Sequence, residues 1–274
     1  MCSSVSCAPT PGSAGADPVD PAPHRLRGQT RDQTSRVDTP LVIEIRDLVK
    51  DYHGLRPLRV EALEVEHGAR VALSGLDAAA GEVFVNLLNG FVIPDTGNVR
   101  LFGQSTRDIG DGDAWLASLD RLGLVTPRNV LLERLSVRQN LALPFTVQIE
   151  PLGAADAARA EAAGADVGLG GEALERPAAQ LGPFDRMRLH LARALALAPS
   201  LLLLEHPTLS LEAADSAAFG ALVRTVAGAA ERRLTVVAVS EDHAFANAIA
   251  RRRLKLNPST GRITPASRGW RLWR

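Results

Sequence analysis

The stretch LGPFDRMRLHLARALALAPSLLLLEHP, residues 181–207, decides the fold. Residues 184–197 place apolar side chains at helical spacing, and residues 200–205 (SLLLLE) form an unbroken apolar run that ends in an acid. Such a run is typical of a strand that is buried on both faces of a sheet. The stretch therefore predicts a strong helix that leads into a central strand.

Shorter apolar runs on either side of this stretch alternate with segments of helical spacing. Further strands are predicted over residues 41–45, 59–66, 70–75, 99–103, 235–240 and 253–257. Further helices are predicted over residues 82–91, 154–165, 212–228 and 242–252. Apolar strands separated by helices predict an α/β fold whose mostly parallel sheet is covered by helices on both faces. The period-two pattern at 59–66 (RVEALEVE) indicates an antiparallel β edge subdomain.

Both ends of the chain depart from this pattern. Residues 1–40 are rich in Pro, Ser, Ala, Gly and charge, so they bury too little apolar surface to offset the entropy of ordering, and a disordered tail is predicted. Residues 1–9 lack the charged start and apolar stretch of a signal peptide. A second tail, residues 266–274, ends in GWRLWR, which suits either a membrane interface or a partner, or else disorder or packing on the domain.

Charge and cysteine usage exclude several functions. Lys and Arg number 31, as do Asp and Glu, so bulk electrostatics gives no attraction to nucleic acid. The two cysteines, Cys2 and Cys7, lie in the predicted tail, which argues against a disulfide scaffold or a Cys-ligated structural metal and favours the cytosol. No run of about 18 uncharged apolar residues occurs, so any membrane span must come from another subunit.

The turn after the predicted strand 70–75 reads GLDAAAGEVFVNLLNG, Gly75 to Gly90, and PDTGNVRLFG follows at 94–103. These segments, and the order of elements over residues 41–265, resemble the ATP-binding cassette of ABC transporters, a P-loop NTPase-like fold. The resemblance implies an antiparallel edge subdomain and a helical subdomain over about 111–182. The competing fold is another P-loop or Rossmann-like domain, and the lack of G-x-G-x-x-G weakens a dinucleotide site.

The residues that grip phosphate in this family are replaced here. In the window G-x-x-G-x-G-K-[ST]-[ST], two glycines become Ala78 and Ala80, the lysine becomes Gly81, and the Mg²⁺-binding Ser/Thr becomes Glu82. The resemblance gives a degenerate nucleotide-binding set of Gly75, Asp77, Ala80, Gly81, Glu82 and Val83. A unit charge at about 4 Å is worth about 4 kcal/mol near a protein surface before screening. A triphosphate beside Glu82 is therefore repelled instead of attracted.

The segment at 122–145 resembles the family's glutamine loop, with Pro127 in place of the glutamine. Its downstream pattern L-[ST]-V-x-x-N-x-A-L-P is similar to the lipoprotein-release and macrolide-export type of cassette, and it survives as Leu135, Ser136, Val137, Asn140, Ala142, Leu143 and Pro144. The signature L-S-G-G-Q, which in the family meets the partner's γ-phosphate, reads LGPFD here. Pro183 and Phe184 replace its two glycines, so one backbone N–H is lost and bulk is added.

The positions that carry catalysis in the family are also replaced. Glu205 stands for the Walker B aspartate, His206 for the catalytic glutamate and Glu241 for the switch histidine, so no catalytic residue is intact. Glu205 retains the chemistry to meet Mg²⁺ if the metal binds, and no other metal site is predicted. Tyr52 stands where the family stacks an aromatic ring on adenine, although the same residue also suits packing of the edge subdomain.

Two functions follow from the resemblance. The first is a pseudo-ATPase subunit with a structural or regulatory role, which docks on a membrane permease through residues 120–180 and pairs with another cassette, as a homodimer or heterodimer. This implies a cytoplasmic protein held at the inner face of the membrane. The alternative is an ATPase in which an Arg replaces the lost Lys, Glu205 holds Mg²⁺ and His206 is the base. That alternative needs a separate compensation at each of five positions, namely the P-loop, the glutamine loop, the signature, the catalytic base and the switch, so the first function is favoured. A decaying gene product is a third reading, and the clean apolar core strands argue against it.

Overall fold

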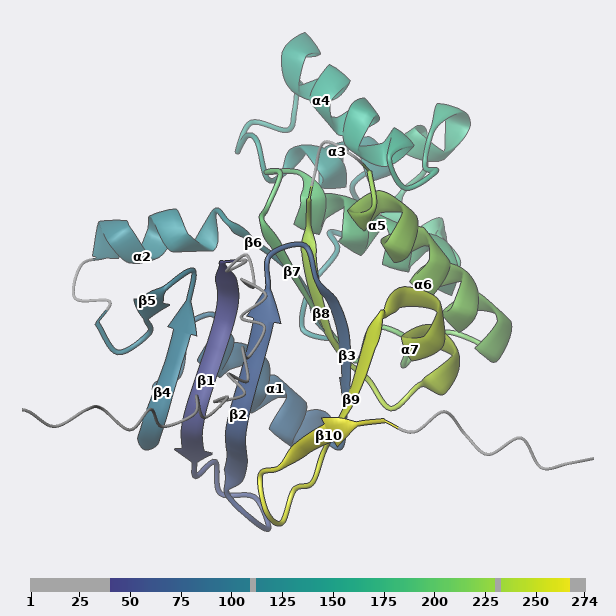
Figure 1. Ribbon diagram of the computed structural model, residues 1–274. Helices are drawn as coiled ribbons and strands as arrows, with labels where there is room; N and C mark the ends of the chain where they lie inside the picture. Colours follow the sequence, from purple (N-terminus) through teal and green to yellow (C-terminus); the bar gives the residue numbers. More distant parts are fainter. Residues whose placement is uncertain (1–39, 109–111, 230–232, 267–274) are drawn as a thin grey trace, which may run out of the picture. The chain divides into compact units, whose positions relative to one another are not determined.

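The central layer is a six-stranded sheet with strand order β10-β9-β3-β8-β7-β6 (Figure 1). The structure, a computed structural model, describes residues 40–108, 112–229 and 233–266, so the predicted tails lie outside it apart from Pro40 and Ala266. The strands of this sheet are β3 (Arg70–Ser74), β6 (Leu122–Val125), β7 (Leu201–Glu205), β8 (Thr235–Val239), β9 (Arg252–Leu256) and β10 (Ile263–Pro265). Every pairing is parallel except that of β10 with β9.

A second, four-stranded sheet has the order β2-β1-β4-β5, and its pairings are antiparallel. Its strands are β1 (Leu41–Lys50), β2 (Leu58–Glu66), β4 (Thr96–Leu101) and β5 (Gln104–Ser105). In β2 buried and exposed residues alternate over 58–61 and again over 63–66, with a change of phase at the half-buried Ala62. The predicted antiparallel β subdomain is confirmed.

Helices cover both faces of the central sheet, and the sheet separates two apolar cores. Helix α1 (Ala78–Leu88) packs between the two sheets, where Phe84 and Leu88 meet the β3, β7 and β8 side chains of one face. Helices α5 (Pro183–Leu195), α6 (Ala213–Ala227) and α7 (His243–Ile249) lie on the other face (Figure 1). Alternate residues of β7 serve each core: Leu201 and Leu203 face one, Leu202 and Leu204 the other.

The region after β5 begins with α2 (Gly112–Leu119) and returns to the central sheet as β6. Beyond β6 it continues in α3 (Val137–Ala142), α4 (Ala154–Ala165) and two 3₁₀ helices, Gly171–Glu175 and Ala178–Gln180. Two predicted helices have different bounds. Helix α1 starts at Ala78 because Asp77 caps it, and α7 ends at Ile249 because Arg252 already pairs with Val71 in β9.

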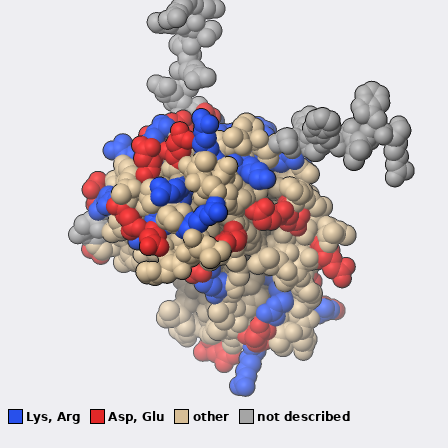
Figure 2. Space-filling view, turned by 90° about the horizontal axis from the view of Figure 1, so that it is seen from below, with Lys and Arg blue, Asp and Glu red and all other residues tan. Residues whose placement is uncertain are grey.

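Surface charge is mixed where it is seen. Figure 2 shows Lys and Arg interspersed with Asp and Glu on the face that it presents. Of the helices that the structure describes, none is long and apolar enough to cross a bilayer.

The buried Asn140 explains why the L-[ST]-V-x-x-N pattern serves the fold and not a ligand. Its side chain is fully buried, accepts from the Leu132 N–H at 2.9 Å and donates to the carbonyls of Leu132, Leu135 and Ser136 at 3.0–3.3 Å. Ser136 meanwhile caps α3 in a reciprocal capping box with Gln139. One amide thus satisfies the backbone of the loop that joins β6 to α3.

We expect Asn140→Ala to lower the free energy of unfolding by about 2–3 kcal/mol, because it leaves buried backbone groups without partners. Urea unfolding followed by circular dichroism measures this loss. The exposed Gln180→Ala serves as the control and should change the free energy of unfolding by less than about 0.5 kcal/mol. Equal stability of the Asn140→Ala and control variants would contradict this role.

Candidate functional site

The site begins at the tight turn between β3 and α1. Gly75 has φ +92°, and a Cβ placed there would lie 2.1 Å from the carbonyl oxygen of Leu256 on β9, so only glycine fits. Two residues later the Asp77 carboxylate caps α1 by accepting the Ala80 N–H at 2.8 Å. The first turn of α1 therefore already carries a negative charge of the chain itself.

Glu241, which follows β8, lies against the same turn. Its Oε1 accepts the N–H of Gly75 at 2.5 Å and that of Leu76 at 3.3 Å. Consecutive N–H groups of this kind form a concave donor site that suits an anion. Here a carboxylate of the chain, at the position of the family's switch histidine, fills that role.

Two carboxylates converge on one guanidinium at the other side of the α1 N-terminus. Arg128 donates to Glu205 in bidentate fashion, at 2.9 Å to Oε1 and 2.5 Å to Oε2. Its Nη1 also lies 3.2 Å from Oε2 of Glu82. The three residues come from the loop after β6, the end of β7 and the second turn of α1. Arg128 thus joins three elements through a single charge.

Burial of the Glu205 side chain explains why this carboxylate needs a charged partner. The Glu205 side chain is 2% exposed, whereas those of Arg128 and Glu82 are 42% and 43% exposed. A buried carboxylate is unfavourable unless it is paired and hydrogen-bonded. The hydrogen bond to Glu205 raises the pKa of Arg128 above its ordinary value; partial burial opposes this, and the charges of Glu205 and Glu82 add to it.

The catalytic-glutamate position holds His206, which is buried and has φ +41°. Its Nε2 lies 3.3 Å from the carbonyl oxygen of Asp77, and its N–H donates to Val239 at 2.8 Å. A Cβ on Gly81, the lysine position, would lie 2.8 Å from that Nε2 and 3.3 Å from Cγ1 of Val239. The imidazole therefore fills space beside α1 that a larger residue at position 81 would need.

Tyr52 lies beside the turn, half-buried against the core that contains α1. Burial raises the pKa of its hydroxyl, and the negative charge of Asp77 raises it further. Its ring covers Gly54, where a Cβ would lie 2.5 Å from Cε2. The ring thus packs on the edge subdomain, and adenine stacking on it stays a prediction.

The signature segment forms the start of α5. Gly182 is the N-cap and Pro183 the first helical residue, a position that tolerates the missing N–H. The guanidinium of Arg188 lies 4.7 Å from the centroid of the Phe184 ring and 3.2 Å from Oδ1 of Asp185. Phe184 also packs against the core, so these replacements are built into the helix start.

A small hollow of about 200 Å³ separates α5 from the site, and its lining includes Pro127, His190 and His206. Burial lowers the pKa of His190 to about 4, and the positive charges of Arg193 and Arg186 contribute to this shift. His190 is therefore neutral in the folded protein at neutral pH.

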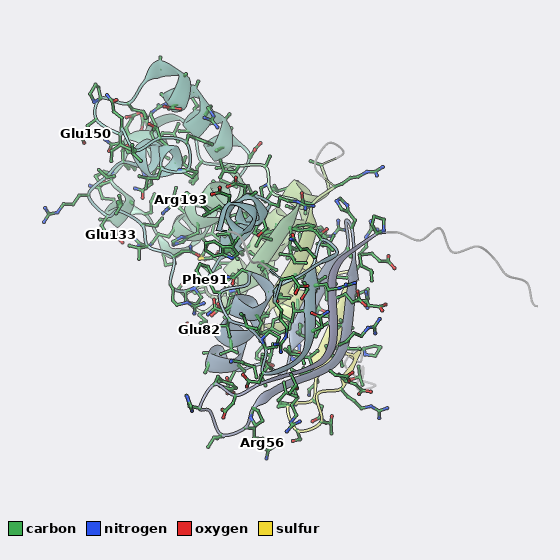
Figure 3. All side chains as sticks on the ribbon, turned by 90° about the vertical axis from the view of Figure 1, so that its left-hand side faces the viewer. Arg56, Glu82, Phe91, Glu133, Glu150 and Arg193 are labelled. Atoms are coloured by element: carbon green, nitrogen blue, oxygen red, sulfur yellow. The ribbon has the colours of Figure 1, made fainter. Side chains whose placement is uncertain are left out.

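The structure brings the predicted site residues to one end of the sheet, around the α1 N-terminus. Figure 3 labels Glu82 on α1 and Arg193 on α5. Sequence reasoning did not identify Arg128. The available signal was its place next to Pro127, in the loop where the family has its glutamine, together with two unpaired acids at positions 82 and 205.

The Mg²⁺ and ATP implied by the resemblance do not fit these residues as they are arranged. Mg²⁺ requires oxygen ligands in near-octahedral geometry, but both Glu205 oxygens and Oε2 of Glu82 already contact the Arg128 guanidinium. A phosphate requires free N–H donors and a cation, but Glu241 holds two of the donors and Gly81 offers no charge. Side chains of the protein itself therefore occupy both the metal position and the phosphate position.

Comparisons with known proteins agree with this fold. A family model described as ABC transporter matches residues 58–209. The lipoprotein-releasing system ATP-binding protein LolD of Myxococcus xanthus is 30% identical over 215 residues, which cover 77% of this chain and 94% of that protein. The L-cystine transport system ATP-binding protein TcyN of Escherichia coli is 30% identical over 227 residues, 81% of this chain and 88% of that protein.

Solved structures show the same architecture. The dimeric ATP-binding cassette MJ0796 bound to ADP and Pi aligns with a TM-score of 0.65 and 21% identity, over 83% of this chain and 100% of that one. A nucleotide-free cassette from an ABC transporter aligns with a TM-score of 0.66 and 15% identity, over 81% and 89%. The fold is that of an ATP-binding cassette. The chain belongs to the ABC transporter family, as an ATP-binding-subunit homologue, and the predicted family and fold class are confirmed.

The contact between Gly81 and His206 predicts a coupled effect on stability. We expect Gly81→Ala to cost about 1–3 kcal/mol in the native background, because the added methyl overpacks the imidazole. In a His206→Ala background the same change should be neutral or stabilising by up to about 1 kcal/mol, because alanine favours the helix interior. Urea unfolding of all four proteins gives the coupling free energy, and additive effects would contradict the contact.

His190 predicts a pH dependence. Because its pKa falls from 6.5 to about 4 on folding, the unfolded chain binds the extra proton first as pH decreases. Stability from this residue is therefore complete above pH 6.5 and is lost as pH falls toward 4. We expect His190→Gln to flatten the stability curve in that window, whereas the exposed His67→Gln should not. Urea unfolding at several pH values measures both curves.

Proposed function

We propose that this chain is a nucleotide-independent, non-hydrolysing cassette subunit of a membrane transporter, with a structural or regulatory role. In this role it docks on a transmembrane permease and pairs with a second cassette, either its own copy or another chain, at the cytoplasmic face of the membrane. The observation that carries the proposal is the Glu241 carboxylate, which holds the N–H donors of Gly75 and Leu76. A γ-phosphate in this position would meet a negative charge instead of a positive one.

The catalytic groups support the same proposal. A general base needs a free nitrogen that faces the attacking water, whereas Nε2 of His206 faces the Asp77 carbonyl at 3.3 Å. The alternative function requires an arginine to replace the lost lysine while Glu205 holds Mg²⁺. The arginine in this site, Arg128, is bonded to Glu205, so it blocks the metal ligand that the alternative requires.

Exposed apolar side chains support the docking role. The Phe91 ring, 61% exposed, packs edge-on against Trp115 with 5.3 Å between ring centroids, and Leu116 is 54% exposed beside it. Nearby, a hollow of about 210 Å³ between β6 and α5 is lined in part by Leu122, Leu124, Pro144 and Leu197. Large exposed apolar patches mark interaction sites. Leu122, Leu124 and Pro144 lie within residues 120–180, where the permease contact is predicted, and the proposed contact extends beyond that segment to Phe91 and Leu116. The resemblance to the lipoprotein-release and macrolide-export type of cassette stays a prediction of the subfamily.

We expect Mg-ATP at millimolar concentration to give no saturable heat in calorimetry and no thermal shift with this protein. Specific binding would stabilise the fold by about 2.7 kcal/mol at a hundredfold excess over Kd, so a positive result would be plain. The M. xanthus LolD relative, tested alongside, serves as a positive control for an intact cassette.

Saturable binding by the wild-type chain would sink the proposal and favour the alternative function. In that case Tyr52→Ala and Glu205→Gln identify the residues that hold the nucleotide. Loss of affinity in Tyr52→Ala indicates adenine stacking, and loss in Glu205→Gln indicates a metal-dependent pose.

The docking role makes a separate prediction. In cells that contain the native transporter, the wild-type chain should sediment with the membrane fraction, and Phe91→Asp should release it to the supernatant. Leu55→Asp is the matched control, because Leu55 is fully exposed and lies in the loop between β1 and β2. Unchanged sedimentation of Phe91→Asp, with circular dichroism showing a folded protein, would rule out this surface as the contact.

A further inference from the structure

We propose that the Arg128 guanidinium is a resident substitute for a divalent cation, and that its removal exposes a metal site formed by Glu82 and Glu205. The inference deepens the proposed function, on which it rests, because it explains how a cassette site stays complete without a ligand. It concerns the metal position alone and needs no assumption about the permease.

The geometry is that of two ligands around one cation. Glu82 comes from the second turn of α1 and Glu205 from the end of β7, and both carboxylates point to the same guanidinium, at 3.2 Å and at 2.5–2.9 Å. Carboxylate oxygens that converge from separate elements are the usual ligands of hard divalent cations. A planar guanidinium presents its N–H groups in a fixed fork that matches carboxylate geometry and carries permanent charge.

Charge balance makes the cation necessary. Glu205 is 2% exposed, so water cannot stabilise its charge, and the negative charges of Glu82, Asp77 and Glu241 lie around the same helix start. Within the described chain, the ion pairs of Glu82 and Glu205 both end on Arg128. Without Arg128 these two carboxylates face each other uncompensated, and a divalent ion is the simplest group to bridge them.

A covalently attached cation differs from a metal in one respect that matters here: it does not exchange. Arg128 belongs to the loop that joins β6 to α3, where Thr126 N–H donates to Asn129 at 2.6 Å and Arg193 of α5 donates to the Val130 carbonyl at 2.6 Å. The loop is thus tied to α1, β7 and α5 by side chains alone. None of these contacts involves a nucleotide or a metal ion.

The test measures Mn²⁺ binding without nucleotide, by loss of the free-ion signal in electron paramagnetic resonance and by thermal unfolding. We expect no specific binding to the wild type, and saturable binding with a rise in Tm for Arg128→Ala. The double variant Arg128→Ala with Glu82→Gln should bind Mn²⁺ about tenfold or more weakly, because it lacks one ligand. Arg128→Lys keeps a charge in the site and should not bind the ion.

Specific Mn²⁺ binding to the wild type, or equal affinity in the single and double variants, would overturn the inference. If Arg128→Ala folds only when Mn²⁺ is present, the inference is supported. If it folds in neither condition, Mn²⁺ binding is measured on Arg128→Gln instead, because its amide can still hydrogen-bond Glu205. ATP binding by the wild type in the absence of metal binding by Arg128→Ala would end both proposals. Metal binding by Arg128→Ala with no nucleotide binding by the wild type supports both.

Discussion

The ion pair between Glu205 and Arg128 is the constraint on which this end of the molecule depends. Strand β7 is buried along its whole length, from Leu201 to Leu204, and it ends in a carboxylate whose side chain is 2% exposed. Breaking such a pair by removing one partner typically costs about 3–5 kcal/mol. The bidentate guanidinium makes the acid tolerable, and its contact with Glu82 extends the same charge to α1.

The same principle operates at the turn before α1. A helix start exposes N–H groups that need acceptors, and in a phosphate-binding protein the ligand supplies them. Here Asp77 accepts from Ala80 N–H, and Glu241 accepts from Gly75 and Leu76. The donors and the acids that a bound nucleotide and metal would satisfy are matched from within, so the fold needs no ligand to complete its polar network at this point.

The sequence predicted the layers of the fold well because they follow from local apolar patterns. The run at 200–205 and the period-two pattern at 59–66 specify a buried and a half-buried strand without reference to the rest of the chain. Element ends were less certain. The start of α1 at Ala78 depends on the Asp77 cap, and the Ala-Ala-Ala-Gly turn that follows has no large apolar residue to show helical spacing.

The site was only partly accessible from the sequence. Register along the family pattern located Glu82, Glu205, His206 and Glu241, because those positions depend on spacing. The partners of these residues depend on side-chain direction across the tertiary fold: the reach of Arg128 from another loop, the turn of Glu241 toward Gly75, and the positive φ of His206. No local pattern encodes such contacts, and the changes of charge at positions 82, 206 and 241 indicated only that other residues must compensate for them.

The replaced positions compensate one another in charge and in volume, which bears on how they are to be understood. Loss of the lysine at position 81 leaves the space beside α1 that His206 fills, and Glu82 shares the cation that neutralises Glu205. Decay of an unused site would leave buried charges unpaired and cavities unfilled, at a cost of several kcal/mol against a total stability of about 5–15 kcal/mol. Replacements that compensate one another instead form a site that is stable as it stands. It also means that returning one residue to the family pattern would introduce a clash or an unpaired charge before it introduced any affinity for nucleotide.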